Sequence, residues 1–192
     1  MQPLSNEQEW IKRAKNGDKE AIGTLYDYYV QSIYQYISYR VDSDAIAEDL
    51  TSEVFLRMVT KLPRFKYTGA PFGSWLFRIA SNLIADHRRQ NYRETPLIGN
   101  ENLSTGGNDV VAAVSLREEK AVLRAALRTL SEDYQNVLIM RFMQDLSHAD
   151  VAAAVGKSVA AVRVLQHRAL KALENALGED VREILGTDAN DE

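Results

Sequence analysis

The sequence predicts an all-α protein in which two helical domains are joined by a flexible linker. Apolar residues recur at helical spacing along most of the 192 residues, and no segment sustains the period of two that marks a strand. Residues 94–114 interrupt that pattern with Gly, Asn, Ser and Thr, a composition typical of linkers. The length allows one domain or two small ones, at about 100–200 residues per domain.

Four helices are expected before the linker, over residues 7–15, 19–40, 44–61 and 72–92. The third follows capping side chains at 42–44, and Pro63 ends it. Gly and Pro mark a loop over 64–71. The fourth carries an apolar stripe from Trp75 to Leu83 at spacings of four. These helices can close one core.

Four more helices are expected after the linker, over residues 115–129, 131–143, 147–155 and 158–177. Ser147 and Asp150 match a capping box before an apolar run, Gly156 suits a helix C-terminus, and Ser158 can cap the last helix. Two short helices joined by a three-residue turn with Gly predict a helix-turn-helix, although an ordinary helical hairpin has the same spacing.

The composition excludes several classes of protein. No cysteine is present, which excludes a disulfide scaffold, a Cys-ligated zinc site and a thiol nucleophile. No apolar run of about 18 residues and no signal peptide are found, so we expect a cytoplasmic protein without membrane insertion. The three histidines, His87, His148 and His167, lack metal-ligand spacing and any nucleophile–base set. We therefore expect no enzyme, no metal and no cofactor.

Charge is distributed unevenly around the overall value of −4. Residues 61–93 hold seven basic side chains and one acidic, and residues 157–171 hold four basic and none acidic. Residues 42–53 hold five acidic side chains and no basic one, and the tail over 178–192 holds six acidic and one basic. This pattern indicates more than one kind of partner.

One helix face is acidic. Asp49, Glu53 and Arg57 share a face of the helix over 44–61 at spacings of four. A solvated face with an ion pair worth a few tenths of a kcal/mol is the plain interpretation. A docking face for a basic protein surface is the alternative.

Two basic regions are candidate nucleic-acid surfaces. The loop over 64–71 and the helix after it mix cations with aromatic rings, as single-strand binding surfaces do. Phe65 and Tyr67 are the candidate stacking rings, Trp75 is expected in the core, and the Asn82 amide can bond a base edge.

The last helix has a face made of Ala160, Arg163, His167 and Lys171, with Val164 and Arg168 alongside. Small residues and cations on one face suit a helix in the DNA major groove, although a merely solvated face is also open.

These segments carry a family resemblance. Residues 49–57 (DLTSEVFLR), 72–82 (FGSWLFRIASN) and 86–89 (DHRR) resemble region 2 of bacterial extracytoplasmic-function (ECF, group IV) RNA polymerase sigma factors. Residues 130–138 (LSEDYQNVL) and 158–169 (SVAAVRVLQHRA) resemble region 4. The resemblance implies region 2 over 1–93, a linker over 94–114, region 4 over 115–178 and an acidic tail over 179–192.

The resemblance also implies a function. The chain would be a dissociable, non-enzymatic subunit that binds core RNA polymerase, recognises minus-ten and minus-thirty-five promoter elements and helps melt the DNA. Its partners would be core polymerase, promoter DNA as duplex and as melted single strand, and an anti-sigma factor. A stand-alone helix-turn-helix regulator is the second hypothesis, but it leaves the acidic face and the basic-aromatic loop without a role.

Site residues follow from the same resemblance. The residues implied for core polymerase are Asp49, Glu53 and Arg57. Those implied for the minus-ten element are Arg64, Phe65, Lys66, Tyr67, Asn82, Arg88 and Arg89. Those implied for the minus-thirty-five element are Ser158, Ala160, Arg163, Val164, His167, Arg168 and Lys171. In this last helix the segment 161–166 (AVRVLQ) has apolar residues at two positions where the family often has polar ones.

Overall fold

The computed structural model describes residues 4–67, 69–94 and 121–178, without the side chains of 91–94. Within those ranges every regular element is a helix. The elements are α1 (Glu7–Lys15), α2 (Lys19–Ser38), α3 (Asp44–Lys61), η1 (Leu62–Arg64), α4 (Phe72–Glu94), α6 (Glu132–Leu138), η2 (Ile139–Met143), α7 (His148–Val155) and α8 (Val159–Leu177). Residues 121–129 are helical as well. The predicted linker, the acidic tail and the first residues of the helix predicted at 115 lie outside the described residues.

The predicted helices are confirmed with small changes at their ends. The first and third have the expected bounds, α2 ends at Ser38 rather than at residue 40, and α4 runs on to Glu94. The helix predicted over 131–143 is α6 followed by the π-helical segment η2. This widening of the last turn was not predicted from the apolar spacing.

Side-chain caps fix the helix starts. Asp18 accepts hydrogen bonds from the amides of Glu20 and Ala21, and Ser43, Ser131 and Ser158 each accept one in the same way. Ser147 and Asp150 form the predicted capping box. Gly156 ends α7 at φ 68°, in the left-handed region that favours glycine. The turn between α7 and α8 is therefore the predicted helix-turn-helix.

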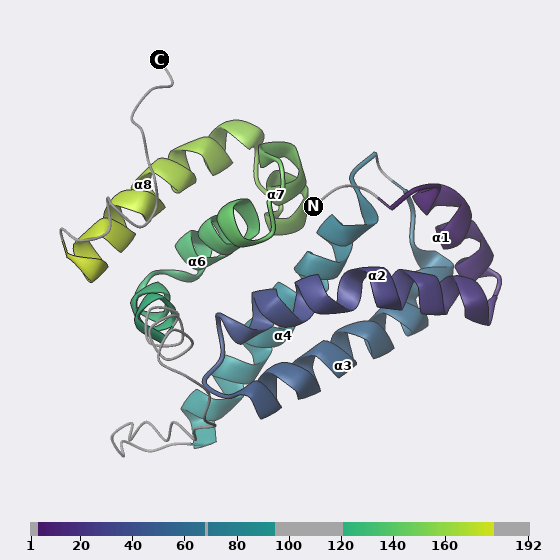
Figure 1. The fold of residues 1–192 in the computed structure, drawn as a ribbon, viewed down its shortest axis with the longest axis horizontal. Coiled ribbons are helices and arrows are strands. Elements are labelled where there is room, and N and C mark those ends of the chain that lie inside the picture. The colour runs from purple at the N-terminus through teal and green to yellow at the C-terminus, as the bar shows by residue number, and fades with distance from the viewer. Residues whose placement is uncertain (1–3, 68, 95–120, 179–192) are drawn as a thin grey trace, which may run out of the picture.

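The N-terminal bundle (residues 4–94) packs α2, α3 and α4 side by side, with α1 across one end (Figure 1). Its core is strongly aromatic: Tyr29, Tyr36, Phe72 and Phe77 are fully buried. Their rings meet edge-on or tilted, with centroids 5.8 Å apart for Tyr29–Phe72 and 5.3 Å for Tyr36–Phe77. Such pairs add to the burial of apolar area.

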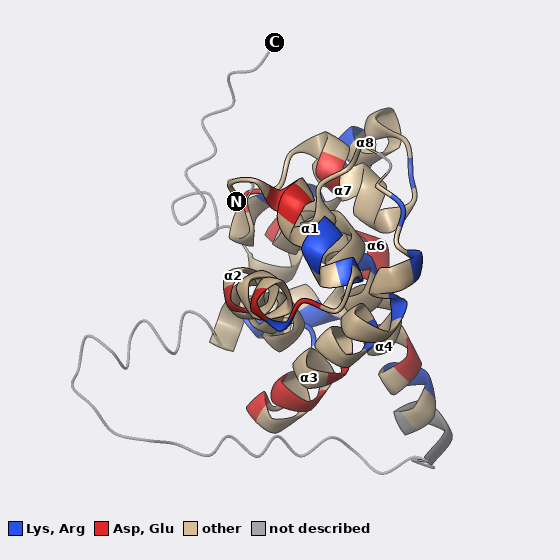
Figure 2. Ribbon diagram, turned by 90° about the vertical axis from the view of Figure 1, so that its right-hand side faces the viewer, with Lys and Arg blue, Asp and Glu red and all other residues tan. Residues whose placement is uncertain are grey.

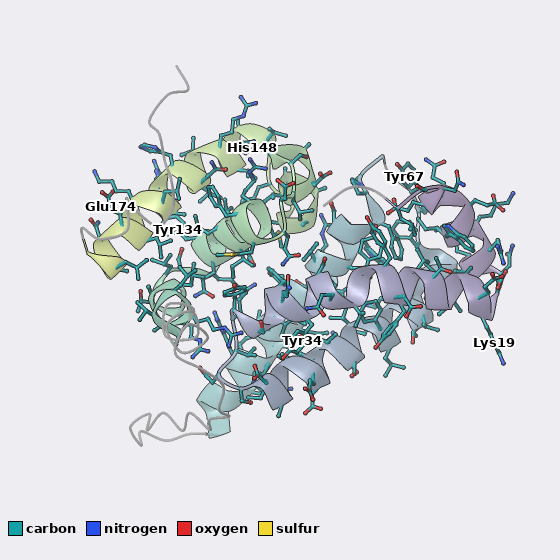
Figure 3. All side chains as sticks on the ribbon, in the orientation of Figure 1. Lys19, Tyr34, Tyr67, Tyr134, His148 and Glu174 are labelled. Carbon is teal, nitrogen blue, oxygen red and sulfur yellow. The ribbon has the colours of Figure 1, made fainter. Side chains whose placement is uncertain are left out.

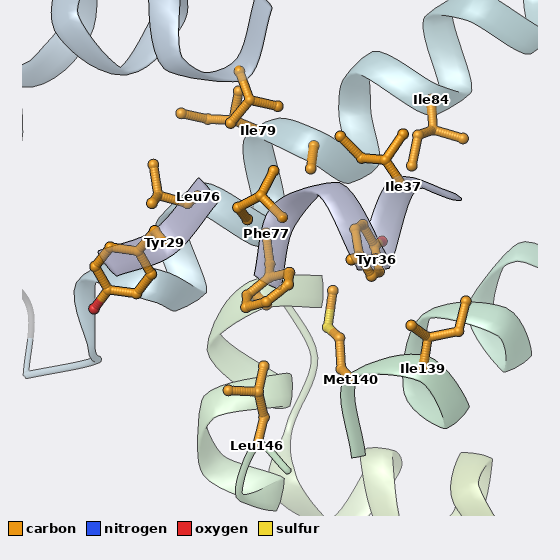
Figure 4. Packing of buried hydrophobic residues seen from close by; sticks show 14 of the residues in the cluster. Tyr29, Tyr36, Ile37, Leu76, Phe77, Ile79, Ile84, Ile139, Met140 and Leu146 are labelled. Carbon is orange, nitrogen blue, oxygen red and sulfur yellow. The ribbon is translucent and has the colours of Figure 1, made fainter. Parts of the chain in front are cut away.

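The C-terminal bundle (residues 121–178) lies against the N-terminal bundle. α7 packs on α4, and η2 packs on α2. Phe77 and Tyr36 point toward Met140 and Leu146 across this contact (Figure 4). The buried apolar residues of the two bundles thus form one continuous cluster. We call this the closed arrangement; α3 lies on the side of the N-terminal bundle away from α6–α8 (Figure 1).

The described helices include none that is long and apolar enough to cross a membrane.

Replacing Ser147 by Ala should destabilise the C-terminal bundle by about 1 kcal/mol, because the capping box loses its acceptor for the Asp150 amide. Denaturant unfolding followed by circular dichroism measures the change. Ser52→Ala is the matched control, since Ser52 is mid-helix and its hydroxyl bonds only to the Glu48 carbonyl of the preceding turn. Equal stability of S147A and the wild type would contradict this role of the cap.

Candidate nucleic-acid and protein interfaces

The outer face of α3 is acidic and exposed. Asp49 is exposed, and Glu53 accepts a hydrogen bond from Arg57 Nε at 2.7 Å. Acidic residues colour much of this helix in Figure 2. Leu56 lies beside them with 62% of its surface exposed, an apolar residue that sequence reasoning did not single out. Leu56 follows Glu53 by three residues in a predicted helix, so this spacing alone could have placed it on the same face. We call Asp49, Glu53, Leu56 and Arg57 the α3 acidic face.

The loop between η1 and α4 is anchored by an aromatic ring. Phe65 packs on Trp75 and Phe72 with centroids 4.8 and 5.2 Å apart, and its carbonyl accepts a hydrogen bond from Lys15 Nζ at 2.8 Å. Phe65 is therefore half-buried, whereas Tyr67 is 49% exposed on the loop beside α1 (Figure 3). Of the two candidate stacking rings, Tyr67 is exposed to solvent, whereas Phe65 packs against other aromatic rings.

A cavity of about 1040 Å³ opens beside this loop. Its wall includes Arg64, Lys66, Trp75 and Arg78 from the N-terminal bundle and Ala153 from α7. Arg64 and Lys66 are exposed. The volume lies just above the usual range for ligand pockets, about 300–1,000 Å³.

A second cavity, of about 290 Å³, adjoins Asn82. Ser81 and Arg78 line it from α4, and Glu132 and Asp133 line it from α6. Arg78 lies on the wall of both cavities, one helical turn before Asn82. Sequence reasoning passed over Arg78 as one base of the basic segment, although its spacing of four from Asn82 placed the two on one face.

The two arginines near the end of α4 differ in their surroundings. Arg88 is half-buried and donates from Nη2 to the Arg40 carbonyl and to Gln135 Oε1, each at 2.9 Å. Burial, together with the nearby Arg40 charge, lowers the pKa of Arg88. Arg89 is exposed and pairs with Asp86. In the closed arrangement, therefore, Arg88 is bonded to α6 and Arg89 is not.

The outer face of α8 is exposed along its length. Its exposed residues are Ala160, Arg163, Val164, His167, Arg168 and Lys171. Val162, Ala169 and Leu173 are buried on the opposite side, and Ser158 accepts the Ala161 amide at 3.1 Å as the cap. The predicted minus-thirty-five residues thus share one free, basic face.

A polar cluster holds α8 against α7. Gln166 Oε1 accepts from Arg141 Nε at 3.1 Å and lies 2.9 Å from His148 Nε2. His148 lies between α7 and α8 (Figure 3). Burial, and secondarily the Arg141 charge, lowers the pKa of His148. This cluster orients the helix-turn-helix.

A buried arginine joins the two bundles. The Arg40 side chain has no exposed surface and donates to Tyr36 Oη at 2.5 Å and to Glu132 Oε1 at 3.1 Å. Asn136 Oδ1 accepts from both Arg40 and Tyr36. Asn136 Nδ2 donates in turn to Ser81 Oγ at 3.3 Å. A buried charge is tolerable only when it is paired and hydrogen-bonded, so Arg40 depends on α6.

Further polar contacts surround this centre. Arg128 pairs with Asp42 at 2.9 Å and donates to the Val41 carbonyl at 2.5 Å. Arg124 lies 4.0 Å from Asp44, and Gln144 donates to Gln35 at 3.5 Å. The closed arrangement is therefore held by ion pairs and hydrogen bonds around an apolar centre.

Among the described residues no group of His, Asp and Glu side chains could hold a metal ion.

Comparison with known proteins extends these observations. Residues 25–94 match Sigma-70 region 2 and residues 120–173 match Sigma-70 region 4. The ECF RNA polymerase sigma factor BldN of Streptomyces coelicolor is 39% identical over 176 residues, which cover 91% of this chain and 67% of BldN.

Two solved structures share the fold. The structure of CnrH in complex with the cytosolic domain of CnrY has a TM-score of 0.70 at 23% identity, covering 91% of this chain and 98% of that one. The sigma factor RpoE in complex with the anti-sigma factor NepR from Bartonella quintana has a TM-score of 0.61 at 20% identity, covering 81% and 95%.

Replacing Arg40 by Ala should open the closed arrangement. The change removes the donor to the buried Tyr36 and Asn136, at a cost of about 1–3 kcal/mol for a buried polar group that loses its partner. Glu132, which is 45% exposed, loses its ion pair. Small-angle X-ray scattering should show a larger radius of gyration, with an unchanged helical signal in circular dichroism.

Arg13→Ala is the control for Arg40, since Arg13 forms partly exposed ion pairs with Asp18 and Glu20 inside the N-terminal bundle. An unchanged radius for R40A would show that the closed arrangement does not depend on the buried arginine.

Proposed function

The chain belongs to the ECF RNA polymerase sigma factors, and we propose that three separate surfaces carry the contacts that this family makes. It is a promoter-recognising subunit for transcription initiation, and its partners are core RNA polymerase and promoter DNA. Sigma factors are regulatory subunits rather than enzymes. We expect this one to act without catalysis of its own, and in the cytoplasm, where RNA polymerase works.

The α3 acidic face is the proposed surface for core polymerase. Asp49 and Glu53 offer negative charge, and Leu56 offers an exposed apolar side chain next to them. Interfaces combine such an apolar centre with a polar rim. The face also lies away from α6–α8, so the C-terminal bundle leaves it accessible (Figure 1).

The loop over 64–71 and the outer face of α4 are the proposed minus-ten surface. Arg64, Lys66 and Arg89 supply charge for phosphates, Tyr67 supplies an exposed ring, and Asn82 supplies an amide beside a cavity. Stacking and cationic contacts of this kind bind melted, single-stranded DNA. Phe65 supports the loop from within through Trp75, and Arg88 becomes available when Gln135 withdraws.

The outer face of α8 is the proposed minus-thirty-five surface. Ala160 permits close approach at the helix N-terminus, and Arg163 can bond a guanine edge with both guanidinium nitrogens. His167, Arg168 and Lys171 follow toward the C-terminus, where they can reach phosphates. Val164, which is 50% exposed, can contact a thymine methyl group.

The closed arrangement cannot contact both promoter elements at once. The elements are separated by about 25 base pairs, or roughly 85 Å of duplex. α7 packs on both α4 and α8, and packed helices lie about 8–10 Å apart, so α8 lies within roughly 20 Å of α4. The two bundles must therefore separate on a promoter.

An anti-sigma factor is a further proposed partner. The structural neighbour RpoE is described in complex with the anti-sigma factor NepR. On this chain, exposed apolar residues such as Leu56 and Tyr67 lie on the surfaces assigned above to polymerase and DNA, so a protein that covered them would block both contacts.

The observation that carries the proposal is the combination of an exposed acidic α3 with an exposed basic face on α8, from Ala160 to Lys171, in one chain. The first experiment is co-elution of the purified protein with sigma-free core polymerase on a sizing column.

Reversing the charges of the α3 acidic face, with Asp49→Lys and Glu53→Lys together, should abolish co-elution with core polymerase, because both side chains would then repel a basic docking surface. Glu9→Lys with Asp27→Lys is the matched control, since it changes the net charge equally at exposed sites on other helices. Normal co-elution of the first double variant would place the docking surface elsewhere.

Arg163→Ala should weaken binding of the reconstituted holoenzyme to a minus-thirty-five duplex by about 1–3 kcal/mol, because a contact to a base edge is lost. The duplex comes from selection with the same holoenzyme, and fluorescence anisotropy measures its affinity. Lys19→Ala, exposed on α2, should change nothing. A parallel loss of core-polymerase binding by R163A would count against the assigned role.

A further inference from the structure

In the closed arrangement, one arginine on the proposed minus-ten face is already hydrogen-bonded to the C-terminal bundle. Arg78 projects from α4, and its Nε donates to the Ala154 carbonyl at 3.2 Å. Its Nη2 donates to the Ala153 carbonyl as well. Both carbonyls belong to the last turn of α7, so the C-terminal bundle lies directly over this part of the N-terminal bundle.

We propose that Arg78 is a further residue of the single-stranded DNA surface, and that the C-terminal end of α7 holds it in the closed chain in place of a DNA phosphate. The inference rests on the proposed function of α4 and names both a contact residue and the internal group that competes for it.

The position of Arg78 supports a DNA contact. It lines the cavity beside the 64–71 loop and also the cavity beside Asn82. A strand that ran from the loop to Asn82 would therefore pass this guanidinium. Arg78 is also exposed even in the closed arrangement, so its charge is available once α7 moves away.

The group that holds Arg78 resembles a phosphate in its chemistry. The cap amides of Gly156 and Lys157 both bond to the Ala152 carbonyl, and Arg78 binds the next two carbonyls. These oxygens lie at the negative end of the α7 dipole. One guanidinium thus meets two close, negatively polarised oxygens, the arrangement that arginine also finds in a phosphate.

Oxygen acceptors on α6 also lie near side chains of α4 that are proposed to bind DNA. Glu132 and Asp133, in the first turn of α6, line the cavity beside Asn82. Arg88, proposed to hold a phosphate, is bonded to Gln135 of α6. The C-terminal bundle therefore presents oxygen acceptors to Arg78 and Arg88, two of the side chains proposed to bind DNA, so closing competes with minus-ten binding.

The test uses the holoenzyme and a fluorescein-labelled single strand that carries the nontemplate minus-ten segment of a promoter selected by that holoenzyme. Arg78→Ala should weaken binding and reduce the slope of log affinity against log salt concentration by about 0.7, the value for one phosphate contact with a single strand. Lys12→Ala, exposed on α1, should leave the slope unchanged.

Arg78→Lys separates the two roles. A lysine keeps the charge for a phosphate but cannot span two carbonyls as the planar guanidinium does. In the holoenzyme, R78K should therefore keep most of the salt slope. In the free chain, both R78K and R78A should increase the radius of gyration, because the clasp on α7 is lost.

Variants of the neighbouring residues distinguish the possible failures. If Asn82→Ala and Arg89→Ala weaken binding of the single strand but R78A does not, Arg78 only clasps α7 and the inference is wrong. If none of the three variants changes binding, the minus-ten surface itself is misassigned. If R78A changes the salt slope but not the radius of the free chain, the competition with α7 is overturned.

Discussion

The burial of Arg40 governs how the two halves of this protein meet. Tyr36 comes from α2, four residues before Arg40, but Asn136 and Glu132 come from α6, some 90 residues further along. Without α6 the guanidinium would face water, where it is well solvated. Closing removes that solvation and replaces it with hydrogen bonds, an exchange that is close to neutral for a buried pair. The apolar contacts of Phe77 with Met140 and Leu146 then supply the net attraction (Figure 4). A contact with these opposing contributions is suited to forming and breaking.

The contact between the two bundles affects the three proposed surfaces differently. The α3 acidic face and the outer face of α8 stay exposed in the closed arrangement, whereas α4 packs on α7 and its Arg78 and Arg88 are hydrogen-bonded to α7 and α6. The closed chain therefore presents its polymerase-binding and duplex-binding sides, while two arginines of its proposed single-strand side, Arg78 and Arg88, are engaged by the C-terminal bundle. The overall acidity fits this division, because the positive charge is concentrated on α4 and α8, and an acidic surface serves the polymerase contact.

The sequence predicted the helices well because each depended on local chemistry. The start of α3 at Ser43 and the turn at Gly156 follow from capping and from glycine's conformational freedom. The pairing of the bundles depends on polar side chains far apart in the chain, and no periodicity reports that Arg40 meets Asn136. For the same reason Phe65 could be placed on the loop but not against Trp75, and Arg78 could not be linked to α7. The exposed faces of α3 and α8 could be predicted because their residues repeat at helical spacing, whereas the roles proposed for those residues stay predictions.

The central claim, that the chain is closed when free and opens when it engages a promoter, is tested most directly by an inter-bundle distance. Because the chain has no cysteine, spin labels can be placed at Gln31→Cys on α2 and Asn175→Cys on α8, both exposed and outside the proposed surfaces. Pulsed electron paramagnetic resonance then gives the distance distribution in the free chain and in the promoter-bound holoenzyme. The account predicts one short, narrow distribution for the free chain and a shift of several tens of ångströms on the promoter, of the order of the roughly 85 Å between the elements. The same short distribution in both states would contradict it.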